Sequence, residues 1–240
     1  MAFILSNIHK RFGDLYVLKE LSMSLEEHQL ICILGPSGCG KTTLLNIISG
    51  VFPPDQGEIS GFEDKSISYL FQETRLLRWK TVEENIDFVL KDRLSKSQRT
   101  EIIARYVDMV GLRDFKNYYP DKLSGGMKQR AAIARAFAYP ADILLMDEPF
   151  KGLDLQLKTA LMQAFISLWL MDKRSAFFVT HDIDEALLLG EKIYVLTERP
   201  GVVKGIISID IPHKERNLHN ENILRIEQEI YKLITNSGRE

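Results

Sequence analysis

Residues 35–43 read Gly35-Pro36-Ser37-Gly38-Cys39-Gly40-Lys41-Thr42-Thr43 and match the phosphate-loop pattern G-x-x-x-x-G-K-[ST] without a mismatch. An apolar run of β-strand character, 30–34, precedes them, and a run of helical character, 43–48, follows. This strand–loop–helix order is the context that the pattern requires. Glycines let backbone N–H groups converge on a phosphate chain, and a helix start adds the positive end of its dipole. We therefore predict a nucleotide site in which Lys41 reaches the β- and γ-phosphates and the Thr42 hydroxyl ligates Mg²⁺.

Composition narrows the class of protein. The chain has 240 residues, 45% of them hydrophobic, which suffices for a sizeable core in one domain. A net charge of −2 gives no electrostatic reason to expect nucleic acid as the main partner. No apolar run approaches the ~18–20 residues that cross a bilayer, and residues 1–6 lack a signal-type start. We expect a soluble chain in the cytoplasm.

The two cysteines, Cys32 and Cys39, do not form a disulfide framework. Cys32 lies in the strand before the loop, where it is expected to fill the core. Because Cys39 is close to Lys41 and to a helix start, its thiol pKa is expected to be lowered. Two interpretations remain: either Cys39 contributes only its backbone N–H to the loop, or it makes the loop sensitive to oxidation.

The remaining pattern alternates between β and helical character, which indicates an α/β fold. Thr81 opens a mainly helical stretch with a capping-box pattern that runs to about residue 138. Apolar spacing from Ile223 to Ile234 predicts a docking helix in the tail. The segments of β character are 2–8, 21–25, 58–60, 66–71, 143–146, 176–179, 192–197 and 205–211, and another helix is expected at 155–170.

A pair of carboxylates ends one of these apolar strands. Asp147 and Glu148 follow directly after the run 143–146. Neighbouring residues of a strand point to opposite sides, so the two carboxylates are expected to have different roles. Asp147 suits Mg²⁺ coordination, directly or through water, and Glu148 suits a general base that activates water.

A second phosphate-binding helix end is predicted at residues 123–130, Leu-Ser-Gly-Gly-Met-Lys-Gln-Arg. Ser124 can cap a helix that begins near Gly125, and Gly125 and Gly126 expose their N–H groups. One nucleotide cannot readily use both helix ends of a single chain. A second copy turned head to tail could present its Ser124 to the γ-phosphate bound by the first copy.

Taken in order, these motifs resemble those of the ATP-binding subunit of ABC transporters over nearly the whole chain. The resemblance implies that Gln72 contacts Mg²⁺ and the attacking water, that Asp154 acts across the dimer interface, and that His181 contacts the γ-phosphate. Phe12 occupies the position of the residue that stacks on adenine, and Tyr16 is a second candidate. Counted together, the catalytic residues are Glu148, His181, Gln72 and Lys41, the magnesium ligands are Thr42, Gln72 and Asp147, and the nucleotide-binding residues are Phe12, Gly35–Thr43, Ser124, Gly125, Gly126, Gln129 and Asp154.

The fold that this resemblance implies is α/β, a P-loop NTPase (RecA-like) core with an N-terminal antiparallel β region and an inserted helical subdomain. One nucleotide-binding domain would cover 1–240. Its expected parts are a core at about 1–84 and 138–212, a helical subdomain at about 85–137 and a C-terminal helical tail at about 213–240.

Within the family, residues 71–85 and 197–201 are similar to the nitrate/sulfonate/taurine import group. The implied function is ATP hydrolysis in a head-to-tail dimer that drives import through membrane permease subunits, with a solute-binding protein as an indirect partner. The permease would dock near Gln72–Trp79, which places the chain at the cytoplasmic face of the membrane. Lys151-Gly152 departs from the usual pair of small residues before Leu153-Asp154.

Other classes fit less well. An exporter ATPase is opposed only by the subgroup resemblance. A non-transport ABC ATPase usually carries two cassettes or a long coiled-coil insertion, and the sequence has neither. A nucleotide kinase or GTPase would not need the Leu-Ser-Gly-Gly stretch, and the guanine-reading pattern [NT]-K-x-D is absent. The transported solute cannot be identified from this chain.

Overall fold

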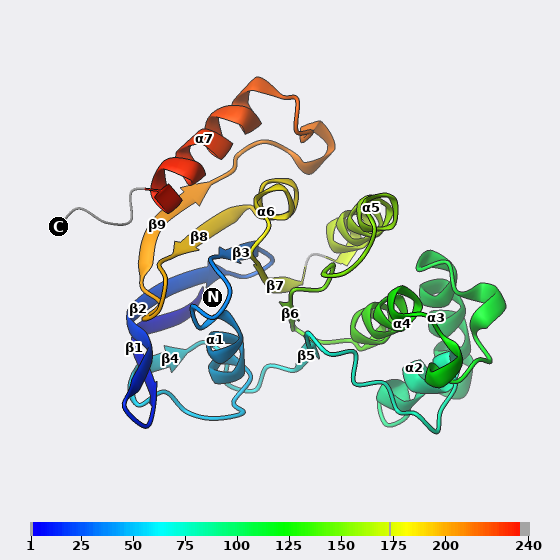
Figure 1. Ribbon diagram of the computed structural model, residues 1–240. Coiled ribbons are helices and arrows are strands. Elements are labelled where there is room, and N and C mark those ends of the chain that lie inside the picture. The colour runs from blue at the N-terminus through cyan, green and yellow to red at the C-terminus, as the bar shows by residue number, and fades with distance from the viewer. Residues whose placement is uncertain (1, 173, 236–240) are drawn as a thin grey trace. The chain divides into compact units, whose positions relative to one another are not determined.

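The computed structural model describes residues 2–172 and 174–235, and the chain divides into two compact units. Unit 1 comprises residues 1–65 and 172–240, and unit 2 comprises residues 66–171. Figure 1 shows the elements of both. The strands are β1 (Ala2–Phe12), β2 (Leu15–Glu26), β3 (Leu30–Leu34), β4 (Gln56–Ser60), β5 (Ile67–Leu70), β6 (Ile143–Asp147), β7 (Ser175–Thr180), β8 (Lys192–Leu196) and β9 (Val203–Ser208). The α-helices are α1 (Lys41–Ile48), α2 (Val82–Leu90), α3 (Lys96–Met109), α4 (Gly125–Ala138), α5 (Leu155–Asp172), α6 (Ile183–Leu189) and α7 (Glu221–Thr235).

Unit 1 is built on two sheets. Strands β2, β1 and β4 form an antiparallel sheet, and β3 lies between the parallel strands β7 and β8, with β9 antiparallel at the edge. Every residue of β3 and β7 is buried, as expected for parallel strands covered on both faces. Tyr194 of β8 is fully buried and donates a hydrogen bond from its hydroxyl to the Ser24 carbonyl of β2 at 2.9 Å. This contact joins the two sheets.

Helix α7 covers one end of unit 1. It packs against α6, β8 and β9 (Figure 1), and Ile223 and Ile230 are its buried residues. Arg216, which precedes α7, is 9% exposed and donates to four backbone carbonyls of the α6, β8 and β9 region. The predicted docking helix in the tail is therefore confirmed, and an arginine outside its apolar face anchors the segment that leads into it.

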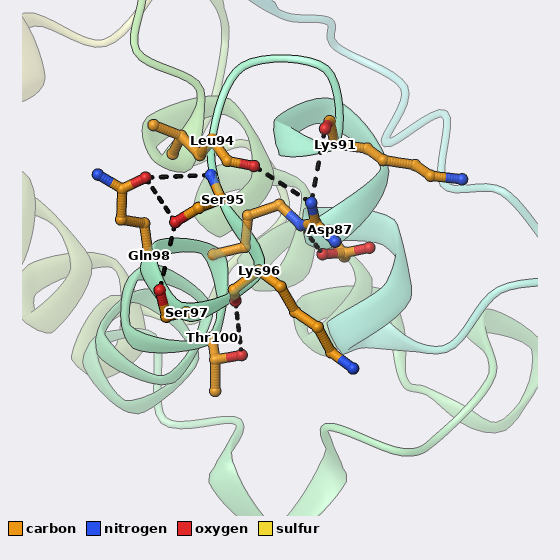
Figure 2. A network of polar contacts seen from close by, with 9 residues as sticks. Asp87, Lys91, Leu94, Ser95, Lys96, Ser97, Gln98 and Thr100 are labelled. Atoms are coloured by element: carbon orange, nitrogen blue, oxygen red, sulfur yellow. Dashed lines mark hydrogen bonds and ion pairs between the residues drawn. The ribbon is translucent and has the colours of Figure 1, made fainter.

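Unit 2 combines the parallel pair β5–β6 with helices α2, α3, α4 and α5. The predicted capping box at the start of α2 is confirmed, because Thr81 accepts from the Glu84 N–H and Glu84 accepts from the Thr81 N–H. Figure 2 shows the connection between α2 and α3, with Asp87 and Leu94 labelled. Arg99 donates to the Asp87 carboxylate at 2.6 Å and to the Leu94 carbonyl at 3.2 Å. This network of polar contacts holds the segment between α2 and α3.

Candidate nucleotide site

The phosphate loop has the backbone that a phosphate cradle requires. Gly38 and Gly40 have φ angles of 81° and 109°, a region that residues with a Cβ rarely adopt. A Cβ on Gly40 would also come within 2.7 Å of Leu18 Cδ2. Helix α1 begins at Lys41 with Gly40 as its N-cap and no side-chain capping hydrogen bond. The first N–H groups of α1 therefore remain suited to an anion.

Lys41 brings its ammonium group into this loop. It is 4% exposed, and its Nζ donates to the Gly35 carbonyl at 2.7 Å and to the Pro36 carbonyl at 2.9 Å. Both acceptors are neutral. A buried ammonium gains more free energy from a charged partner than from a carbonyl, so the Lys41 ammonium and its position fit the binding of a phosphate chain.

The prediction of a lowered Cys39 pKa is wrong. Cys39 is 1% exposed, and a Cβ on Gly35 would come within 2.9 Å of its Sγ, so the side chain lies underneath the loop. Burial raises the pKa of the Cys39 thiol, and the charges of Lys41 and Arg199 only partly oppose this effect. The predicted filling of the core by Cys32 is confirmed, since Cys32 is fully buried.

The sheet of unit 1 brings His181 to the same edge as the loop. Leu34 of β3 pairs in parallel with Thr180 of β7, so Gly35 and His181 each follow a paired residue. The Gly35 N–H also donates to the Thr180 carbonyl at 3.4 Å. His181 is exposed, and Asp182 caps helix α6 directly after it. The backbone on both sides of His181 is thereby fixed.

Phe12 and Tyr16, the two candidates for stacking on adenine, lie on the hairpin of β1 and β2. Each is 50% exposed. Phe12 makes an edge contact with Phe52 at a centroid distance of 5.7 Å, which leaves part of its ring surface accessible. Both residues stay candidates.

In unit 2, the predicted carboxylates and Gln72 lie at one end of the β5–β6 pair. Leu70 pairs in parallel with Met146, so Gln72 and Asp147 follow closely after neighbouring positions. Asp147 is 2% exposed, Glu148 is buried and Gln72 is exposed. The parallel register therefore gathers three predicted residues at the same edge.

Glu148 occupies a tight turn. Its φ is 47°, which is uncommon for a residue with a side chain. Its carboxylate forms an ion pair with Lys151 Nζ at 2.7 Å. Gln129 of α4 is buried and donates from Nε2 to the Pro149 carbonyl at 2.7 Å, so α4 holds this turn in place. Lys151, which stands where the family usually has a small residue, thus forms an ion pair with the predicted general base.

The two remaining motifs of unit 2 are helix caps. The Ser124 hydroxyl accepts from the Met127 N–H at 3.2 Å, which confirms the predicted cap of α4. A Cβ on Gly125 would meet nothing within 4 Å, so packing inside the chain does not require glycine there. Asp154 is exposed and accepts the Leu157 N–H at 3.0 Å at the start of α5.

The loop after Gln72 is held by two side chains that sequence reasoning missed. Arg135 of α4 donates to the Thr74 and Arg75 carbonyls at 2.9 and 2.8 Å. Asn85 of α2 is fully buried, accepts the Leu77 N–H at 2.8 Å and donates to three carbonyls of the loop and its junction with α2. Sequence reasoning missed Arg135 because its acceptors lie about 60 residues away in the chain. Asn85 acts on backbone groups only four to eight residues before it, and its residue type alone does not mark that role.

The proposed magnesium ligands supply a hydroxyl, an amide and a carboxylate oxygen, which are the hard donors that Mg²⁺ prefers. Within residues 2–172 and 174–235, no group of three or more His, Cys, Asp and Glu side chains could hold a metal ion. The chemistry of the donor set fits an ion that is held in part by nucleotide phosphates. In the same part of the chain, no helix is long and apolar enough to span a bilayer.

Comparison with known sequences shows the family. Residues 18–151 match the ABC transporter family. A nitrate import ATP-binding protein of Synechocystis sp. is 37% identical over 228 residues, which cover 92% of this chain and 86% of that protein. An aliphatic sulfonates import ATP-binding protein of Bacillus cereus is 37% identical over 237 residues, which cover 95% of this chain and 92% of that protein.

Solved structures show the same fold. The dimeric structure of a bacterial ABC transporter cassette is 31% identical, with a TM-score of 0.78, and the match covers 88% of this chain and 100% of that one. A dimeric post-hydrolysis state bound to ADP and Pi has 30% identity and a TM-score of 0.76, over 88% of this chain and 100% of that one. The predicted α/β fold of the P-loop NTPase type is confirmed.

The chain belongs to the ABC transporter family, as an ATP-binding subunit. Proteins of this kind are ATPases, and this confirms the predicted enzyme class.

Proposed function

We propose that this chain hydrolyses ATP to drive import of nitrate-, sulfonate- or taurine-like solutes through membrane permease subunits. The observation that carries the proposal is the phosphate loop with Lys41 Nζ inside it and the uncapped start of α1 beside it. Lys41, the loop amides and His181 would bind the phosphates, and Phe12 or Tyr16 would stack on adenine. The relatives named for import favour an importer over an exporter.

Mg²⁺ would be held by Thr42, Gln72 and Asp147, and when bound it would neutralise charge that develops on the phosphates. Glu148 would accept a proton from the attacking water, and Gln72 would orient that water. The burial of Glu148 and its place at the end of β6 support this assignment.

The second half of each site would come from another copy of the chain. In a head-to-tail dimer, Ser124, Gly125 and Gly126 of one copy would face the γ-phosphate held by the other, and Asp154 would act at the interface. The open space around Gly125 and the dimeric state of the related cassettes support this arrangement.

The permease would dock near Gln72–Trp79 at the cytoplasmic face of the membrane, and a solute-binding protein would deliver the solute to it. Trp79 is 73% exposed, and an indole at the surface suits an apolar partner helix. Co-purification of this chain with a polytopic membrane protein, followed by solute-binding assays on the associated receptor, tests this part of the proposal. A purified complex that exports its solute would contradict it.

Replacement of the base tests the chemistry. We expect Glu148→Gln to bind ATP but to lose at least ~10² in kcat, since the amide cannot accept the proton from water. The same variant should accumulate as an ATP-bound dimer in size-exclusion chromatography. Asp121→Asn, which changes an exposed carboxylate outside the predicted site, serves as the matched control. A fully active Glu148→Gln would remove Glu148 from the role of base.

A further inference from the structure

The connection between β8 and β9 reaches the phosphate loop. We call residues Thr197–Gly201 the brace. The Thr197 hydroxyl donates to the Pro200 carbonyl at 2.9 Å and accepts the Val202 N–H at 3.0 Å, so the brace is closed on itself. It contains Arg199 and Gly201, both of which lie against the phosphate loop. The predicted site contained neither residue.

Arg199 holds a peptide group in the middle of the phosphate loop. Its Nε and Nη2 both donate to the Gly38 carbonyl, at 2.9 and 2.7 Å. The N–H of the same peptide group belongs to Cys39 and donates to the Pro36 carbonyl at 3.3 Å. Because a peptide group is planar, contacts at its two ends fix its orientation. Without these contacts the backbone at Gly38, whose φ is 81°, would have the conformational freedom of glycine, which exceeds that of other residue types.

Gly201 lies against the next carbonyl of the loop and is hydrogen-bonded to β2. A Cβ on Gly201 would lie 2.3 Å from the Cys39 carbonyl oxygen, so only glycine permits this approach. The Gly201 N–H donates to the Val17 carbonyl at 2.8 Å, and its own carbonyl accepts the Lys19 N–H at 3.2 Å. The brace thus joins β2 to the centre of the loop through backbone contacts.

We propose that Arg199 is a positioning residue for the polyphosphate of ATP and ADP. Through the Gly38 carbonyl it keeps the loop in its binding conformation before the nucleotide arrives, which lowers the cost of ordering on binding. The inference rests on the proposal that Gly35–Thr43 binds the phosphates. A change in the conformation of the free loop reduces the binding free energy of every ligand by the same amount. Loss of Arg199 should therefore weaken the binding of ATP and of ADP equally.

The test compares Arg199→Ala and Arg199→Lys with Arg225→Ala, which changes an exposed arginine of α7. Dissociation constants are measured with fluorescent ATP and ADP analogues. Arg199→Ala should raise both constants by about 5- to 30-fold, the range for lost hydrogen bonds to a charged group at a partly exposed site. Arg199→Lys should recover only part of this, because a lysine cannot donate through a fork. Arg225→Ala should bind as the wild type does, and kcat of Arg199→Ala at saturating ATP should change by less than about twofold.

Amide hydrogen exchange in the nucleotide-free protein gives an independent measurement. Exchange of the loop amides should become faster in Arg199→Ala and stay unchanged in Arg225→Ala. Lys41→Ala separates the two proposals. If it binds nucleotide normally, the phosphate-loop assignment itself fails. If Lys41→Ala loses nucleotide binding while Arg199→Ala keeps wild-type affinity and wild-type amide exchange in the loop, the positioning role fails. It also fails if Arg199→Ala loses affinity for ATP but not for ADP.

Discussion

Cys39 belongs to the phosphate loop, and Arg199 contacts that loop. The sequence predicted the wrong direction of the pKa shift for Cys39, and it predicted no role for Arg199. Cys39 was expected to be activated by its neighbours, yet its side chain lies under Gly35, and burial raises its pKa. Arg199 is 161 residues from Gly38 in the chain, and two of its nitrogens hold the Gly38 carbonyl. The sequence neighbours of Cys39 therefore led us to overestimate the effect of nearby charge on its pKa, and the sequence could not show the contact between Arg199 and Gly38.

The thiol of Cys39 should react slowly in the folded protein. A raised pKa leaves a smaller thiolate fraction at neutral pH, and the rate of alkylation should keep rising with pH beyond the ordinary range for a thiol. We expect iodoacetamide to modify native Cys39 at least about tenfold more slowly than the urea-unfolded chain. Mass spectrometry on a Cys32→Ala background measures this at one site. Equal rates in native and unfolded protein would restore the interpretation of an oxidation-sensitive loop.

At the scale of elements, the bounds of the central strands were predictable, whereas those of the exposed hairpin of β1 and β2 were not. The fully buried strands β3, β6 and β7 have continuous apolar runs, and their observed bounds lie within a residue of those expected. Strand β2 was expected only at 21–25 but begins at Leu15. Residues 15–20 are exposed, buried and exposed in successive pairs, so the alternation by which a strand is recognised is missing there. Strand β1 extends to Phe12, and shifts of register interrupt its pairing with β2.

Arg216 should determine whether α7 stays attached to unit 1. Its guanidinium donates to the carbonyls of Ile211, Leu187, Gly190 and Ile209 at 2.6–3.3 Å. Burial lowers the pKa of this group to about 10, so it remains charged at neutral pH. Arg216→Met would leave these carbonyls without their donor and should reduce the free energy of unfolding by about 2–4 kcal/mol.

Urea unfolding of the nucleotide-free protein measures this effect. Arg216→Lys should recover only a small part of the loss, because one ammonium cannot reach four carbonyls spread around a planar group. Arg225→Met, on the exposed face of α7, provides the matched control and should unfold as the wild type does. An unchanged midpoint for Arg216→Met would show that apolar contacts alone hold the helix.

At the scale of the whole molecule, the order of motifs along the chain predicted the family, because each motif has its own chemistry. The motifs are divided between the two units: the loop and His181 belong to unit 1, and Gln72, Ser124, Glu148 and Asp154 belong to unit 2. What the sequence could not predict is how each motif is held. Arg135 and Arg199 bind backbone carbonyls of segments that are distant in the chain, and such contacts leave no local pattern.

The division of motifs allows a test of the two-chain site by mixing variants. Ser124→Arg should bind ATP but not hydrolyse it, and Lys41→Ala should lose phosphate binding, so each variant alone should be inactive. In a mixed head-to-tail dimer, one site combines the intact loop of the first variant with the intact Ser124 of the second, and the other site carries both defects. With random pairing, about half of the dimers are mixed, and each mixed dimer has one intact site of its two. Roughly a quarter of all sites are then intact. ATPase activity should therefore reappear on mixing. In a second experiment, Glu148→Gln replaces one of the two variants in the mixture. This tests whether Glu148 acts on the nucleotide bound by the phosphate loop of its own chain. If the mixture of Ser124→Arg and Lys41→Ala stays inactive while size-exclusion chromatography shows mixed dimers, the phosphate loop and Ser124 act within one chain.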